Sequence, residues 1–218
     1  MNKSKLIITS VALAAAAFSV PAAAQSAAQT AGPWYVGVGL GQSFGSGGNT
    51  SGTIPGTAIP FTTSGFDDNK TSFQINGGYQ FTPEWGVEVQ YTWLGERDGT
   101  LTAAGRTATF NDVKLYQWGV AGTYTMAFNQ NWFGRGKLGV SSNHIDSSTA
   151  TIAGVGTVGY GGGNKTDVLA GIGVGYKWNA NFSTRLEYEY FGKFESNNGN
   201  QTSNVKANNI GLRMQYNF

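Results

Sequence analysis

The sequence contains no cysteine, and only 12% of its 218 residues are charged, with a formal net charge of +2. A soluble domain usually carries about 25% charged residues. The lack of cysteine excludes a disulfide scaffold, and the lack of any basic run argues against nucleic acid as a partner. Beyond the first 24 residues, no apolar run approaches the roughly 18 residues that a transmembrane helix requires. The chain must therefore be stabilised by another kind of fold.

Residues 1–24 have the features of a cleaved signal peptide. Lys3 and Lys5 precede the apolar stretch Leu6–Val20, and Ala22-Ala23-Ala24 forms a small-residue cleavage site before Gln25. The apolar stretch is too short to span a bilayer, which argues against a membrane anchor. We therefore expect an exported protein with a single mature domain, residues 25–218.

The mature sequence alternates between apolar and polar residues in runs of about 9–11 residues, the length that a tilted strand needs to cross a bilayer. The runs cover residues 34–43, 71–81, 85–94, 114–126, 132–143, 166–178, 182–191 and 208–218. Short connections at 82–84, 127–131 and 179–181 alternate with long ones at 44–70, 95–113, 144–165 and 192–207. Short turns on one side and long loops on the other are typical of outer-membrane barrels, whose loops face outward.

These patterns predict an all-β fold, an eight-stranded antiparallel up-and-down transmembrane β-barrel in the outer membrane of a Gram-negative bacterium. Closure is expected because an open sheet edge would leave backbone groups unpaired in hydrocarbon. A soluble β-sandwich also alternates, but its apolar face is a core. It would leave unexplained why all six tryptophans lie on the apolar face of their runs, mostly near the ends.

The two faces of the runs predict two sets of residues. Aromatic side chains near the run ends are expected to form girdles at the membrane boundaries: Trp34, Trp85, Trp93, Trp118, Trp132, Trp178 and Phe218. Charged side chains on the opposite face are expected to form a network inside a narrow lumen, where charges must be paired: Glu88, Arg135, Lys137, Arg185, Glu187, Glu189 and Arg213.

Several motifs resemble the membrane domain of OmpA-type proteins. They are Trp34-Tyr35-x-Gly37, Gly77-Gly78-Tyr79-Gln80, Gly86-x-Glu88-x-x-Tyr91-x-Trp93-Leu94-Gly95, Thr184-Arg185-Leu186-Glu187-Tyr188 and Gly211-Leu212-x-Met214-x-Tyr216-x-Phe218. The resemblance implies an interior ion pair between Glu88 and Arg185 and, in some members, a narrow pore gated by such pairs. The positions that match the family's second pair hold Ala121 and Gly175, so Arg135 and Lys137 are expected to pair with Glu187 or Glu189 instead.

The resemblance also bears on the end of the chain. A last strand ending in Phe218 is similar to the signal that outer-membrane assembly machinery recognises. The peptidoglycan-binding domain found in many family members has no counterpart after Phe218, so that role is not expected. The expected partners are this machinery, outer-membrane lipid and lipopolysaccharide, and the barrel is expected to be a monomer.

Two functions compete for the barrel. One is a structural outer-membrane protein with a narrow pore through its charged lumen. The alternative is a surface adhesin or host-interaction barrel, which binds a host or surface ligand through its long loops.

No enzyme, cofactor or metal site is expected. Ser141 or Ser142 with His144, the single histidine, and Asp146 could suggest a catalytic triad. Residues 142, 144 and 146, however, share one side of a strand end without an oriented base. Asp67-Asp68 offers too few oxygen ligands for calcium.

Overall fold

The structure is a computed structural model that describes residues 32–47, 50–54, 57–64, 69–160, 162–197 and 202–218. The predicted signal peptide therefore lies outside the described residues. Within them, no helix is long and apolar enough to cross a membrane. The strands are β1 (Trp34–Gly47), β2 (Thr50–Thr53), β3 (Pro60–Ser64), β4 (Asn69–Gln80), β5 (Trp85–Ala103), β6 (Arg106–Ala127), β7 (Trp132–Ile145), β8 (Ser148–Ile152), β9 (Gly156–Tyr160), β10 (Gly163–Lys177), β11 (Phe182–Asn197) and β12 (Thr202–Asn217).

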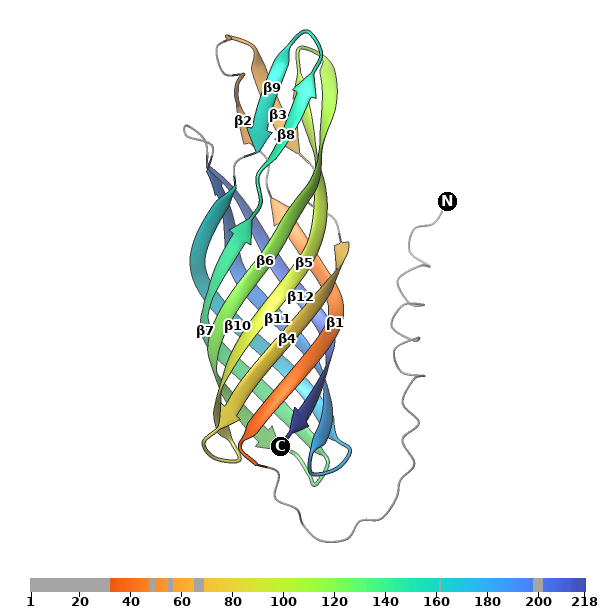
Figure 1. Cartoon of the computed structure of the whole chain (residues 1–218), viewed down its shortest axis with the longest axis vertical. Coiled ribbons are helices and arrows are strands. Elements are labelled where there is room, and N and C mark those ends of the chain that lie inside the picture. The colour runs from red at the N-terminus through yellow and green to blue at the C-terminus, as the bar shows by residue number, and fades with distance from the viewer. Residues whose placement is uncertain (1–31, 48–49, 55–56, 65–68, 161, 198–201) are drawn as a thin grey trace, which may run out of the picture.

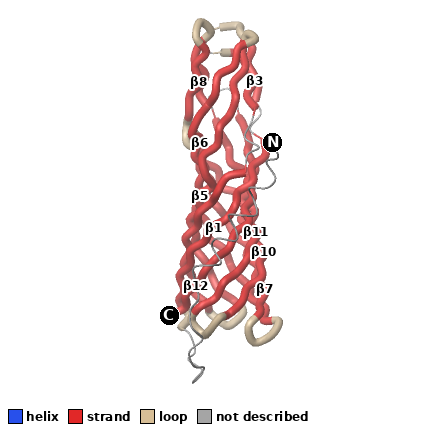
Figure 2. The backbone as a smooth tube through the Cα atoms, turned by 90° about the vertical axis from the view of Figure 1, so that its right-hand side faces the viewer, coloured by secondary structure: helices blue, strands red, loops and turns tan. Residues whose placement is uncertain are grey.

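Eight long antiparallel strands close into a barrel, which confirms the predicted fold class (Figure 1). Around the wall they follow the order β1, β4, β5, β6, β7, β10, β11 and β12, and β12 pairs with β1. Val38 of β1 lies opposite Ile75 of β4 on one side and Met214 of β12 on the other. A view turned by 90° shows the same elongated shape with strongly tilted strands (Figure 2).

Three short turns close one end of the barrel, which we call the turn end. In each turn, a side-chain oxygen of the second residue after the strand accepts hydrogen bonds from the backbone N–H groups two and three positions later, at 2.8–3.2 Å. These residues are Thr82, Asn129 and Asn179. Such side-chain bonds favour turns over continued strand. The backbone N–H of Phe218 donates to the carbonyl of Trp34 at 3.0 Å, so the first and last strands also meet at this end.

At the opposite end the long connections are mostly strand, and the expectation of long loops was wrong. β5 continues to Ala103 and β6 begins at Arg106, and the two-residue turn between them has positive φ at Ala104 (49°) and Gly105 (71°). Strands β3 and β2 extend this hairpin into a four-stranded sheet, and β8 pairs with β9. These segments form strands because hydroxyl-bearing residues alternate with apolar ones, which suits a half-buried sheet.

This outer structure consists of β2, β3, residues 99–110 of the β5–β6 hairpin, β8 and β9, and we call it the platform. The β8–β9 hairpin packs over the inner face of the four-stranded sheet, where Phe61, Leu101, Ala150 and Ile152 belong to one buried cluster. Arg106 Nη1 donates to the carbonyl of Ala153 at 2.6 Å and ties the sheet to the hairpin. The platform therefore has a core of its own.

The barrel wall changes its pairing at two junctions below the platform. The β4–β5 ladder reaches up to Phe73–Trp93, where β5 bulges. There Ser43 Oγ lies 2.6 Å from the carbonyl of Leu94 and 3.2 Å from that of Lys70. Between β10 and β11, Ser141 Oγ makes the equivalent contact with the carbonyl of Phe191, at 3.1 Å. Buried serine hydroxyls thus link strand backbones where the regular ladders stop.

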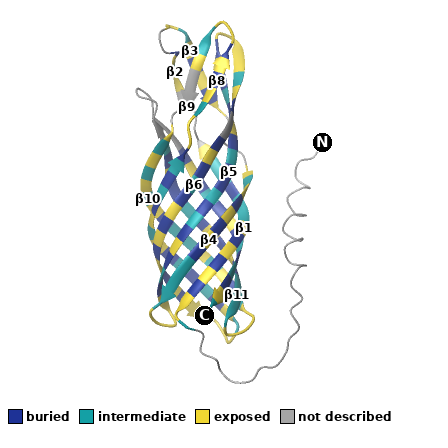
Figure 3. Ribbon diagram, viewed as in Figure 1, coloured by how far each residue is buried: buried dark blue, intermediate teal, exposed yellow. Residues whose placement is uncertain are grey.

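The side chains that fill the interior change from mostly polar to mostly apolar at the height of these junctions. Below it, most buried residues are polar, although Tyr35, Ala121 and Phe133 are buried there as well. The polar ones are Gln74, Asn76, Gln90, Thr92, Gln117, Asn209 and the charged residues described below. Above it lies a continuous apolar cluster, the apolar plug, which joins the platform core: Leu94, Phe110, Val113, Leu115, Leu169, Phe191, Phe194, Val205 and Ala207. Burial alternates along the strands throughout the barrel (Figure 3). The change occurs within two residues, at Thr92–Leu94 on β5 and Glu189–Phe191 on β11.

Candidate functional site

The seven charged residues expected in the lumen are all buried, and each is at most 5% exposed. They lie on β5, β7, β11 and β12 and form one connected group, which we call the lumen cluster: Glu88, Arg135, Lys137, Arg185, Glu187, Glu189 and Arg213. Four of these side chains are basic and three are acidic. The strand period of two places them inward because their neighbours on either side face the lipid.

Glu88 is the centre of one half of this cluster. Its Oε2 lies 2.9 Å from Arg135 Nη2 and 3.1 Å from Arg185 Nη2. The same oxygen accepts hydrogen bonds from Tyr35 Oη and Asn76 Nδ2, both at 3.1 Å. The predicted Glu88–Arg185 contact is therefore present, but Glu88 is shared among several donors rather than held in one pair.

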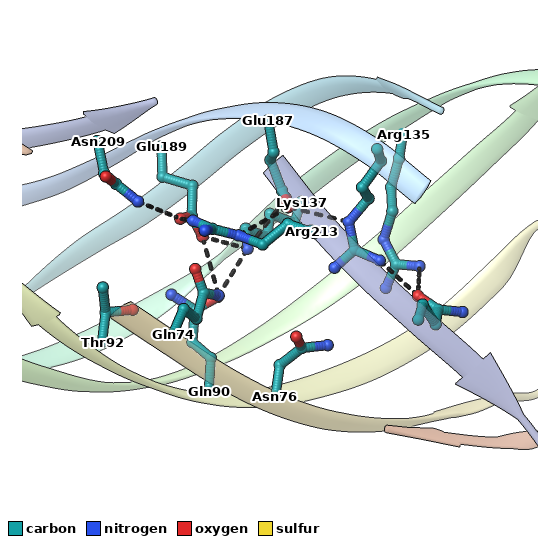
Figure 4. Close-up of polar contacts among 12 residues, drawn as sticks. Gln74, Asn76, Gln90, Thr92, Arg135, Lys137, Glu187, Glu189, Asn209 and Arg213 are labelled. Atoms are coloured by element: carbon teal, nitrogen blue, oxygen red, sulfur yellow. Dashed lines mark hydrogen bonds and ion pairs between the residues drawn. The ribbon is translucent and has the colours of Figure 1, made fainter. Parts of the chain in front are cut away.

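Lys137 is the centre of the other half. Its ammonium lies 3.2 Å from Glu88 Oε1 and 3.0 Å from Glu187 Oε1, contacts Glu189, and donates to Gln90 Oε1 at 2.6 Å. The guanidinium of Arg213 also contacts Glu189. Figure 4 shows these side chains converging from opposite walls, with Gln74 and Asn209 beside Glu189.

Glycines on the facing strands make room for the long basic side chains. A Cβ added at Gly39 of β1 would lie 2.4 Å from Arg213 Cδ, and one added at Gly171 of β10 would lie 2.8 Å from Lys137 Cε. Any larger residue would displace a paired charge. The glycines of β1 and β10 thus explain how seven long side chains fit in one narrow barrel.

The aromatic residues expected to form girdles lie on the outward face. Trp34, Trp85, Trp132, Trp178 and Phe218 are 47–62% exposed around the turn end. They pack against neighbouring rings, as Trp34 does against Tyr79 and Trp85 against Tyr124, each with ring centroids 4.8 Å apart. Trp93 and Trp118 lie toward the other end of the same apolar band. Two aromatic levels around an apolar band match a bilayer with two interfaces.

The structure does not assemble the considered triad. The ring of His144 stacks on Tyr116 with centroids 5.0 Å apart. Ser142 Oγ instead donates to Asn164 Oδ1 at 3.0 Å, while Ser141 faces the interior. In the part of the chain that the structure describes, no group of three metal-ligating side chains is placed to hold a metal ion. Asp67 and Asp68 lie outside the described residues.

The platform presents a second surface, which was not predicted from the sequence. Its four-stranded sheet turns Phe61, Leu101 and Ala103 inward and places rows of hydroxyl side chains outward. Register puts one row across all four strands and a second across three. We call this surface the hydroxyl face: Ser51, Thr62, Thr102 and Thr107 in the first row, and Ser64, Thr100 and Thr109 in the second. The signal in the sequence was the repeated Thr-x-Thr or Thr-x-Ser spacing at 62–64, 100–102 and 107–109.

A closed antiparallel barrel with an apolar outer band, aromatic girdles and a charged interior defines an outer-membrane β-barrel protein. The sequence agrees, because residues 10–218 match the family described as outer membrane protein beta-barrel domain. The chain belongs to that family. In outer-membrane barrels the short turns lie on the periplasmic side, which is therefore the side expected for the turn end.

Several solved structures are similar to this chain at low sequence identity. OprG from Pseudomonas aeruginosa is 16% identical with a TM-score of 0.50, covering 86% of this chain and 98% of that one. The neisserial surface protein NspA is 17% identical with a TM-score of 0.48, covering 85% and 97%. Ail of Yersinia pestis, solved with the heparin analogue sucrose octasulfate, is 14% identical with a TM-score of 0.43, covering 84% and 99%. No curated protein matches the sequence.

Proposed function

We propose that this protein is a closed outer-membrane anchor that holds a rigid recognition platform above the cell surface. The observation that carries the proposal is the continuity of the apolar plug, which joins the platform core to the upper barrel interior. A binding surface held this way loses little conformational freedom when it binds a partner. Of the two functions considered from the sequence, this supports the surface-interaction barrel, with strands in place of loops.

The narrow pore is the less favoured function. A conducting path would have to pass both the lumen cluster, whose charges contact one another directly, and the apolar plug above it. Planar-bilayer recordings of the refolded protein test this point. We expect no unitary current steps, and reproducible steps that change on substituting Arg185 would favour the pore.

Attachment of cells tests the platform itself. In a trimmed variant, residues 100–109 and 148–160 are each replaced by an Asn-Gly turn, which suits a two-residue hairpin. The barrel below keeps its ladders and lumen cluster. We expect cells that display the trimmed protein at normal levels to lose attachment to the surfaces and cells that the full chain binds. Equal attachment by both proteins would contradict the proposal.

The same proposal includes the molecule's membrane partners. The apolar band contacts lipid, and lipopolysaccharide surrounds its outer rim. The β12 strand, ending at Phe218 and aligned along β1, is proposed as the segment that the assembly machinery recognises.

A further inference from the structure

The hydroxyl face stands well clear of the membrane. β6 alone spans 22 residues, or roughly 70 Å along the strand, whereas a bilayer crossing needs about 9–11 residues. The face is rigid, because β-branched threonines have few rotamers and the residues beneath them are packed. Its hydroxyl groups recur about 4.8 Å apart across strands and about 6.8 Å apart along them.

The chemistry of the face is unusually uniform. Across residues 50–64, 99–110 and 148–160 the only charged residue is Arg106, whose guanidinium already donates to Ala153. Among the residues whose side chains the structure describes, the exposed large apolar side chains all belong to the barrel and its turns. An anionic polymer would find almost no cation here. A small ligand would find the outward face of a sheet instead of the concave site such ligands prefer.

A second copy of the same face suits such a surface, because it needs neither a cation nor a concave site. A hydroxyl group both donates and accepts hydrogen bonds, so an array of hydroxyls is complementary to itself. Two identical uncharged faces also avoid the like-charge repulsion that opposes most self-contacts. Related by a two-fold axis, two copies present the same row spacing to each other.

We propose that the hydroxyl face binds the hydroxyl face of a second copy of this chain on a facing membrane. The inference rests on the proposed recognition function and names its partner. The hydroxyl face has seven residues, whereas a stable interface takes about 20–30 residues a side, so single molecules stay monomeric. Many copies on two opposed membranes act together, and their summed contacts hold the membranes to each other.

Clustering of vesicles tests this partner. The protein is reconstituted at many copies per vesicle in zwitterionic lipid, and clustering is followed by light scattering. One variant carries Thr62→Lys, Thr102→Lys and Thr107→Lys, and a second carries Glu at the same positions. We expect vesicles with the unchanged protein to cluster, and each variant alone to lose at least tenfold in clustering rate. Mixed Lys and Glu vesicles should cluster again.

The matched control places three lysines on the other face of the platform, at the exposed Thr149, Thr151 and Thr157 of β8 and β9. These vesicles should cluster with themselves as the unchanged protein does, and should not cluster with the Glu vesicles more strongly than the unchanged protein does. Clustering by the Lys variant at the unchanged rate would overturn the inference, as would no clustering of the unchanged protein.

The two proposals fail in different ways. If unchanged vesicles do not cluster but trimming the platform still abolishes cell attachment, the platform recognises another partner and only the self-contact is wrong. If trimming changes neither attachment nor clustering, the recognition function itself is wrong.

Discussion

The membrane-spanning half and the platform half share the same strands but have opposite interiors. In the lower half the outward face is apolar and the inward face holds the lumen cluster; in the upper half hydroxyls face out and the apolar plug lies within. The surrounding solvent explains the reversal. Lipid offers no hydrophobic gain for burying apolar groups, so polar groups gather inside and bond to one another. The upper half is surrounded by water, where burying apolar side chains is favourable, so its interior is an apolar core.

The largest loss of stability is expected when a charge is removed from the lumen cluster in the lower half. Glu88→Gln removes the carboxylate that three cations share and leaves four basic residues against two acidic ones. Breaking a buried ion pair typically costs about 3–5 kcal/mol, and we expect a loss of that size in the free energy of unfolding, measured by urea titration in lipid. Arg185→Ala should cost less, because Arg135 and Lys137 still contact Glu88.

The exposed turn residue Glu84 provides the control for this experiment. Glu84→Gln should change the free energy of unfolding by less than about 0.5 kcal/mol. A loss near 1 kcal/mol for Glu88→Gln would indicate that water enters the cluster and that the lower interior is not dry.

The upper interior should respond to lost volume instead of lost charge. Phe110 is fully buried in the apolar plug, and Phe110→Ala should cost about 3–5 kcal/mol locally through the cavity it leaves. Hydrogen exchange should speed up in residues 99–110 while the barrel strands keep their protection. The neighbouring exposed Thr109→Ala is the matched control and should leave exchange unchanged. Uniform loss of protection would mean that the two interiors unfold as one unit.

The same substitution on the two outward faces compares their surroundings directly. Val38 faces lipid at mid-barrel and is 50% exposed, so Val38→Lys should cost about 2–4 kcal/mol. Thr102→Lys on the hydroxyl face should cost less than about 0.5 kcal/mol. Both are read from urea titrations of the reconstituted protein, and equal costs would refute the assignment of the boundary between lipid and water.

The smallest effect is expected at the junction between the halves. Ser43 is fully buried, bonds to the carbonyl of Leu94 and accepts a bond from Arg97 Nη2 at 3.0 Å. Ser43→Ala leaves buried polar groups short of a partner, which costs about 1–3 kcal/mol. We expect faster hydrogen exchange at residues 94–97, with the exposed Ser46→Ala as the control. An unchanged exchange rate would show that the bulge of β5 holds its shape without the hydroxyl.

The lower half was predictable from sequence because its rule is simple. A period of two separates Glu88 and Arg185 from the lipid-facing valines and leucines, and the short turns limit the register. This alternation shows which side chains face the lumen, but it does not show how far along the barrel axis each one lies. Arg135 was expected beside Glu187 or Glu189 but pairs with Glu88. Tyr35 of β1 and Asn76 of β4 complete that site.

The strands of the upper half were not predicted because their residue types are compatible with both loops and strands. Threonine, glycine and serine are common in loops, and here threonine is the outward half of a strand pattern whose inward half is Leu101 or Ala103. The partners are also remote, since Thr62 pairs with Thr102 across forty residues. The β5 bulges between Trp93 and Gly99 change which positions of the strand face inward. The buried position of Arg97 therefore could not be inferred by counting alternate residues from Glu88.

The continuous length of β5 and β6 has a mechanical consequence. A force that pulls on the platform at the Ala104–Gly105 turn is directed along both strands, into ladders that pair Gly86–Trp93 with β4 and Leu115–Ala127 with β7. Those hydrogen bonds are loaded in shear and share the tension, instead of opening one after another like a zipper. The anchor should therefore outlast the contact it carries, so that under tension two joined surfaces part at the platform and leave the barrel in its membrane.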